Sequence, residues 1–156
     1  MSEIIINRAR AASVTGHRVM EKGYDREKLK NTLENLTKIG YDTFLVGMAL
    51  GFDTLCFQVL EEIREETPLK IIACIPCDSQ PIKFNDEQKK EYNRMLVSAD
   101  ERVYVSHAYD DKCMMRRNKY LVDNSSVIVS YLRRNYGGTF FTVNYAKKQK
   151  IKIIET

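Results

Sequence analysis

Short apolar runs alternate along this chain with longer stretches in which apolar residues recur every three or four positions. Runs typical of buried strands occur at 11–14, 44–46, 70–75, 102–105, 127–132 and 151–154. Stretches with the spacing of one helix face cover about 25–39, 53–67, 85–99, 112–123 and 140–149. This alternation predicts an α/β fold, a Rossmann-like three-layer αβα arrangement with a mainly parallel, twisted sheet of about six strands.

Several helix ends carry recognisable capping residues. Asp25 is placed to cap the first helix, and Gly40 to end it. Asn85 with Gln88 three positions later has the spacing of a capping box. These signals fix the predicted starts of two helices independently of the apolar pattern.

The stretch from Phe44 to Thr54 combines a buried strand, two glycines and a predicted helix start. Gly47 ends the strand, Gly51 lies in the short loop, and Asp53 and Thr54 open the helix. Loop N–H groups and the helix dipole could form an anion site there, because glycine allows a ligand to approach the backbone. The alternative is an ordinary tight turn in which Asp53 or Thr54 caps the helix.

Three glycine-containing turns follow predicted strands and should meet at one edge of the sheet. They are 15–18 (Thr-Gly-His-Arg), 47–53, and 137–139 (Gly-Gly-Thr). Open α/β sheets bind ligands at the carboxyl ends of their strands. The set therefore predicts a phosphate-bearing ligand held by backbone N–H groups and a threonine hydroxyl, with His17 and Arg18 contacting phosphate or a base edge.

Composition narrows the class of protein. The length of 156 residues suits one domain over 1–156, with a short arm at 1–10. The net charge of +4 favours an anionic ligand without requiring nucleic acid. No apolar run reaches membrane-spanning length and the first residues do not form a secretory signal, so we expect a cytoplasmic protein that does not enter a membrane. Nine tyrosines and six phenylalanines are numerous for one small core, which is compatible with self-association.

Four cysteines, at 56, 74, 77 and 113, raise the question of a metal or redox site. Cys74 and Cys77 have C-x-x-C spacing, but Cys74 lies inside a predicted strand and no second pair of ligands accompanies them. We therefore expect buried, reduced thiols and no metal site.

The ordered motifs resemble a known family. T-G-H-R at 15–18, G-M-A-x-G-x-D-T at 47–54, R-R-N-x-x-x-V-D-x-S at 116–125 and G-G-T at 137–139 are similar to the SLOG superfamily, and more narrowly to its YpsA-like branch of uncharacterised bacterial proteins. The resemblance covers nearly the whole chain from Ala11. It implies a Rossmann-like fold related to DprA and to the LOG phosphoribohydrolases, and a nucleotide or nucleotide-derived ligand, with no further cofactor required.

The LOG pattern is matched only in part. Its M-x-x-R-K motif resembles residues 114–118, which places Arg117 at the catalytic arginine and Asn118 at the lysine. Gly138 and Thr139 match the following glycine and threonine, but residues 140–142 include no glutamate. Cleavage of an N-glycosidic bond needs a carboxylate to stabilise positive charge or activate water. Asp53 or Asp123 would have to take that place.

These observations lead to three hypotheses. In the first, the protein is a nucleotide-binding module or sensor, in which Arg18 and Arg117 supply charge and Asp53 accepts a ribose hydroxyl or caps its helix. Asn118 and Asp123 then fix the arginine. The predicted ligand-binding residues are Thr15, Gly16, His17, Arg18, Gly47, Gly51, Asp53, Arg117, Asn118, Gly137, Gly138 and Thr139.

The second hypothesis is a LOG-like nucleoside monophosphate hydrolase, with Arg117 and either Asp53 or Asp123 as the catalytic candidates. The third is a DprA-like single-stranded DNA-binding domain. A nucleic acid is the least expected partner, because no strong Lys/Arg stripe interleaves with aromatic residues.

Overall fold

The computed structural model describes residues 4–156, so the first three residues of the predicted arm lie outside the described part. The strands are β1 (Ala11–Gly16), β2 (Thr43–Val46), β3 (Lys70–Ile75), β4 (Glu101–Tyr104), β5 (Val127–Tyr131) and β6 (Lys152–Glu155). The helices are α1 (Arg26–Lys38), α2 (Phe52–Arg64), α3 (Asp86–Ser98), α4 (Cys113–Asp123) and α5 (Gly138–Lys148), with short 3-10 turns η1 (Arg8–Arg10) and η2 (Gln80–Lys83). The predicted alternation is confirmed, although α5 begins before the expected Phe140.

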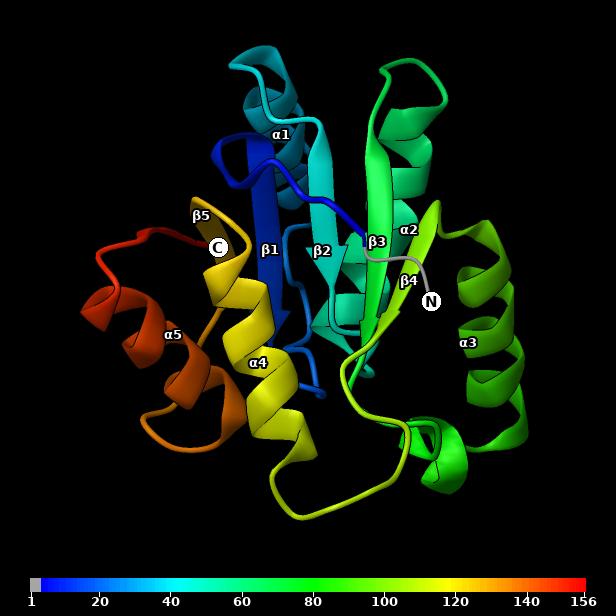
Figure 1. The fold of residues 1–156 in the computed structure, drawn as a ribbon. Coiled ribbons are helices and arrows are strands. Elements are labelled where there is room, and N and C mark those ends of the chain that lie inside the picture. Colours follow the sequence, from blue (N-terminus) through cyan, green and yellow to red (C-terminus); the bar gives the residue numbers. More distant parts are fainter. Residues whose placement is uncertain (1–3) are drawn as a thin grey trace.

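The sheet is parallel throughout the described residues, with strand order β4-β3-β2-β1-β5-β6 (Figure 1). The chain moves outward from β1 to the edge strand β4 and then returns to place β5 on the other side of β1. A ligand crevice forms at such a reversal, because the connections on its two sides leave the sheet in opposite directions. The sheet geometry therefore points to the carboxyl ends of β1 and β5.

Helices cover both faces of the sheet. α1, α2 and α3 pack on one face through the largest apolar cluster, which contains Leu33, Phe57 and Tyr92. α4 and α5 cover the other face, and Ile4 and Ile6 of the arm pack there beside α4 (Figure 1). The small residues of β1 allow close packing on both sides, and they are fully buried. No described helix is long and apolar enough to cross a membrane.

Two of the predicted caps are confirmed. The Asp25 side chain accepts from the Lys28 amide at 3.0 Å, and Asn85 and Gln88 form both hydrogen bonds of a capping box. The alternative in which Asp53 or Thr54 caps α2 is wrong, because Gly51 is the N-cap of that helix and makes no side-chain bond. Instead, Asp53 accepts from the Ala49 amide and the Thr54 hydroxyl donates to the Ala49 carbonyl, each at 3.1 Å, so both side chains brace the loop.

Gly51 is required because another segment of the chain packs against its backbone. Its φ is +76°, and a Cβ atom there would lie 2.2 Å from the Arg18 carbonyl oxygen. The loop after β1 thus rests directly on the backbone at the start of α2, and the Phe52 amide donates to the His17 carbonyl at 3.1 Å. Any side chain at Gly51 would push these two loops apart.

We predict that Gly51→Ala destabilises the protein far more than Gly23→Ala. Gly23 has nearly the same φ, +77°, but a Cβ atom there would meet no other atom within 4 Å, so it is a control for a positive φ without a close contact. Gly23→Ala should cost about 1 kcal/mol and Gly51→Ala at least about 3 kcal/mol in urea denaturation. Equal costs for the two variants would contradict the close packing of the two loops.

Candidate ligand-binding site

A cavity of about 790 Å³ opens at the carboxyl ends of the strands, beside the reversal between β1 and β5. It brings together segments that are distant in sequence, from the loop after β1 to the start of α5. Nine of the twelve predicted ligand-binding residues line it: Thr15, Gly16, His17, Arg18, Asp53, Arg117, Asn118, Gly138 and Thr139. The expected convergence of separate turns on one edge is therefore present in the geometry.

The other predicted residues lie behind or outside this cavity. Gly47 and Gly51 support its walls, and Gly137, with φ +92°, precedes α5 as its N-cap. Asp123 is exposed on α4 and accepts a hydrogen bond from the Tyr145 hydroxyl at 2.8 Å. Asp123 therefore neither reaches the cavity nor touches Arg117, because its side chain leaves α4 on the face that meets α5.

Gly47 accommodates a buried arginine. Its carbonyl accepts from the guanidinium of Arg117 and from Gln80 Nε2, the latter at 3.1 Å. A Cβ atom at Gly47 would lie 2.9 Å from Arg117 Nη1. The sequence suggested that this glycine lets a ligand approach the backbone, whereas the structure places the side chain of Arg117 there.

Arg117 is only 6% exposed, and its hydrogen bonds orient the residue beside it. Arg117 Nε donates to Asn118 Oδ1 at 2.9 Å, so the amide group of Asn118 is fixed with its oxygen on the arginine. Asn118 Nδ2 has no acceptor within residues 4–156 and lies 3.6 Å from a Cβ atom built on Gly138. A donor is therefore directed toward the start of α5.

Asp53 is a buried carboxylate at the floor of the cavity. Oδ2 accepts from the Ala49 amide, but Oδ1 has no hydrogen-bond partner in the described part of the chain. Burial raises the pKa of Asp53 to about 6, against the opposing effects of the Arg117 charge, the Ala49 amide and Arg18. An unpartnered oxygen at this depth fits a ligand group that donates, such as a hydroxyl.

The start of α5 offers several unused donors. In residues 4–156, the amides of Gly138, Thr139 and Phe140 have no hydrogen-bond acceptor, as expected for a first helical turn without a capping side chain. α2 differs, because its first amide is already bonded to His17 and the Asp53 carboxylate lies in its first turn. Of these two helix starts, α5 therefore has the geometry that suits an anion, and α2 does not.

Charged residues around the cavity are mainly cationic. Arg18, Lys83, Arg117 and Arg134 line it, against the single carboxylate of Asp53. The sequence patterns did not single out Lys83 or Arg134. The position of Arg134 just before the Gly-Gly-Thr turn was a usable signal, whereas Lys83 is brought in by η2, which no sequence motif indicates.

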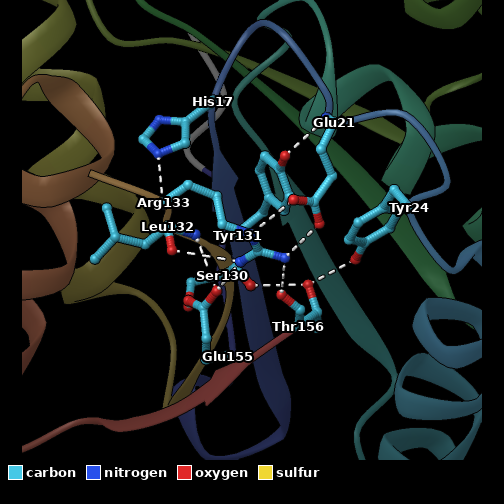
Figure 2. Close-up of polar contacts among 9 residues, drawn as sticks. All are labelled: His17, Glu21, Tyr24, Ser130, Tyr131, Leu132, Arg133, Glu155 and Thr156. Atoms are coloured by element: carbon cyan, nitrogen blue, oxygen red, sulfur yellow. Dashed lines mark hydrogen bonds and ion pairs between the residues drawn. The ribbon is translucent and has the colours of Figure 1, made fainter.

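A polar network holds the loops beside the cavity in place, and the sequence did not indicate it (Figure 2). The guanidinium of Arg133 bonds to Glu21 at 2.9 Å and to Glu155 at 2.7 Å, and it lies 4.2 Å over the ring of Tyr131. Its partners come from the loop after β1 and from β6. These contacts join three segments that lie far apart in sequence.

The four cysteines are buried thiols without disulfides. Among residues 4–156, no cluster of three or more His, Cys, Asp or Glu side chains has the arrangement of a metal site. Cys77 lines the cavity but is only 1% exposed.

We predict a pH-dependent contribution of Asp53 to stability. Its folded-state pKa of about 6 exceeds the reference value of 3.8, so the folded protein binds this proton more tightly. The stabilisation is present at low pH and is lost as the pH rises through 6. In urea denaturation, the stability of wild type relative to Asp53→Asn should fall by about 1.4 kcal/mol between about pH 5 and about pH 7.5. A difference that does not change with pH would contradict the burial of a titrating carboxyl here.

Comparison with known proteins relates this arrangement to a family. The model of the YspA SLOG family (YpsA) matches residues 14–154. A relative of this chain is the uncharacterised SPbeta prophage-derived protein YoqJ of Bacillus subtilis, 31% identical over 137 residues that cover 79% of this chain and 80% of that protein.

Solved structures show the same fold. DNA processing protein A (DprA) from Streptococcus pneumoniae matches 94% of this chain and 50% of its own length, with a TM-score of 0.68 and 15% identity. DprA from Helicobacter pylori, which binds single-stranded DNA, matches 96% of this chain and 66% of its own length, with a TM-score of 0.67 and 14% identity. This chain thus spans half to two thirds of those proteins, and the likeness concerns the fold alone. Since the family model covers most of the sequence, the chain belongs to the YspA SLOG family.

Proposed function

We propose that this protein binds a nucleotide or a nucleotide-derived ligand, with the phosphate at the start of α5. The observation that carries the proposal is the group of unused amides of Gly138, Thr139 and Phe140 beside a cavity lined by Arg134. A helix N-terminus with free N–H groups and a nearby cation is suited to a phosphate. The first turn of α2 is less suited, because Asp53 would repel an anion.

The remaining chemistry of the cavity fits the rest of a nucleotide. The unpartnered Oδ1 of Asp53 would accept from a ribose hydroxyl. On the side of η2, the cavity is lined by Ile82, Phe84 and Tyr109, which offer apolar and aromatic surface for a flat base. A phosphate, a hydroxylated sugar and a base thus each meet a complementary surface. We assign this function to the cytoplasm, where nucleotides are abundant and the cysteines would remain reduced.

Calorimetry with a panel of nucleoside mono-, di- and triphosphates tests the proposal, with the matching nucleosides as phosphate-free controls. We expect at least one phosphorylated ligand to bind at least about tenfold more tightly than its nucleoside, since charge-assisted hydrogen bonds contribute about 1.5 kcal/mol or more each. Folded protein that binds no member of the panel would overturn the proposal.

Removal of one amide donor provides a sharper prediction. Gly138→Pro deletes the N–H group at the first position of α5, where proline is well tolerated and where no bond within the protein is lost. We expect affinity for the phosphorylated ligand to fall by about threefold to tenfold, with little change in thermal stability. The matched control is Gly138→Ala, which places the same Cβ atom 3.6 Å from Asn118 Nδ2 but keeps the N–H group and should retain affinity. Asp86→Pro, at the first position of α3 and outside the cavity, should leave affinity unchanged.

A hydrolase is the second candidate, and the buried carboxylate of Asp53 near Arg117 favours it. If the anomeric carbon of a bound nucleoside monophosphate lay beside Asp53, that carboxylate could stabilise the developing positive charge. Base release measured by chromatography, present in wild type and lost in Asp53→Asn, would support hydrolysis. Binding without base release would leave the protein as a binding module.

Single-stranded DNA is the third candidate, because the Helicobacter pylori protein of the same fold binds it. A short oligonucleotide that competes with the nucleotide and shows a steep loss of affinity with salt would favour this alternative. Binding of mononucleotides with a weak salt dependence would favour the proposed function.

A further inference from the structure

The imidazole of His17 is held in a single orientation at the wall of the cavity. His17 is only 5% exposed, and its ring packs edge-on against Tyr131 with the ring centroids 5.7 Å apart. His17 Nε2 accepts a hydrogen bond from the backbone amide of Arg133 at 2.8 Å (Figure 2). A ring nitrogen that accepts from an amide carries no proton, so the neutral ring has its proton on Nδ1.

The amide of Arg133 is itself fixed. The neighbouring Leu132 amide donates to Glu155 Oε2 at 3.0 Å, and the guanidinium of Arg133 bonds to Glu21 and Glu155. The guanidinium also lies over the ring of Tyr131, so this short segment after β5 is held on several sides (Figure 2). It therefore cannot turn away to release His17 without breaking several charge-assisted bonds.

The surroundings of His17 keep it neutral near pH 7. Burial lowers the pKa of His17, and the charges of Arg134 and Arg133 lower it further, while Glu155 alone opposes them. Protonation would also place a proton on Nε2, facing the amide of Arg133. The Nδ1–H group, in contrast, has no acceptor within residues 4–156, and its residue lines the cavity.

We propose that His17 binds the phosphate of the ligand as a neutral Nδ1–H donor, and that Arg133 is the positioning residue that selects this tautomer. The inference rests on the proposed function and identifies an additional donor for the same phosphate. His17 and Arg134 line the same cavity, and Asn118 directs Nδ2 toward Gly138 at the start of α5. Donors from the loop after β1, from α4 and from the start of α5 thus line one cavity, which suits an oxyanion.

Two substitutions separate the roles of the ring nitrogens. In His17→Asn, the side-chain amide nitrogen can occupy the place of Nδ1, so a donor to the ligand is kept while the acceptor for Arg133 is lost. In His17→Gln, the side-chain oxygen can reach the place of Nε2 and accept from Arg133, but the donor is lost. We expect His17→Gln to weaken nucleotide binding by about tenfold or more and His17→Asn by less than about threefold.

Nitrogen-15 NMR of the imidazole tests the tautomer directly, without ligand. Wild type at neutral pH should show a protonated Nδ1 and an unprotonated Nε2, and the Nδ1 resonance should shift when the nucleotide found by calorimetry is added. Arg133→Ala keeps the backbone amide but removes the guanidinium bonds that hold it in place, so it should produce a mixture of tautomers and weaker binding. Its neighbour variant Arg134→Ala should weaken binding but leave the tautomer unchanged, since Arg134 lines the cavity and makes no bond to His17.

The outcomes distinguish this inference from the function on which it rests. If wild type binds nucleotide but carries the proton on Nε2, or if His17→Gln binds like wild type, the role of His17 is overturned and the proposed function stands. If wild type binds no nucleotide and no inorganic phosphate, the proposed function fails, and the ligand role of His17 fails with it. Thermal melts of each variant verify that affinity is compared between folded proteins.

Discussion

The return of the chain from β4 to the side of β1 determines where a ligand can lie. Because β1 and β5 are neighbours while their following helices cover opposite faces, the loops at their carboxyl ends diverge and leave a cavity between them. Thr15 and Gly16 reach this cavity from the end of β1, Asp53 and Thr139 from the first turns of α2 and α5, and Arg117 and Asn118 from the middle of α4. The order of the parallel strands thus determines the position of the cavity as well as the fold.

Within that cavity, charges are separated between floor and rim. Asp53 and Arg117 are buried at the floor, where removal from water opposes the charged form of each and their mutual attraction favours it. The unused donors lie at the rim, at the start of α5. A ligand of the proposed kind, with an anion at one end and a hydroxyl group at the other, would be oriented by this separation, because each end would be poorly matched in the reversed position.

The fold could be predicted from the sequence, because apolar periodicity and helix caps depend on residues that are close together along the chain. The glycines show where this reasoning fails. Gly16, Gly47 and Gly51 were expected to admit a ligand, but a Cβ atom at each would meet Phe52, Arg117 or the Arg18 carbonyl. A glycine pattern reports close approach of something to the backbone and does not say whether that is a ligand or another part of the chain. The Arg133 network could not be predicted from the sequence either, because Glu21 lies 112 positions and Glu155 22 positions away from Arg133.

The walls of the cavity come from both helical layers. Arg18 and Asp53 belong to segments on the side of α1 and α2, whereas Asn118 and Thr139 belong to α4 and α5. A molecule that contacts both sets would act as a strut that ties the two layers across the edge of the sheet. A ligand bound in the cavity would then act chiefly by making the whole chain more resistant to unfolding and proteolysis. A protease or a partner could detect that difference without any change in the shape of the protein.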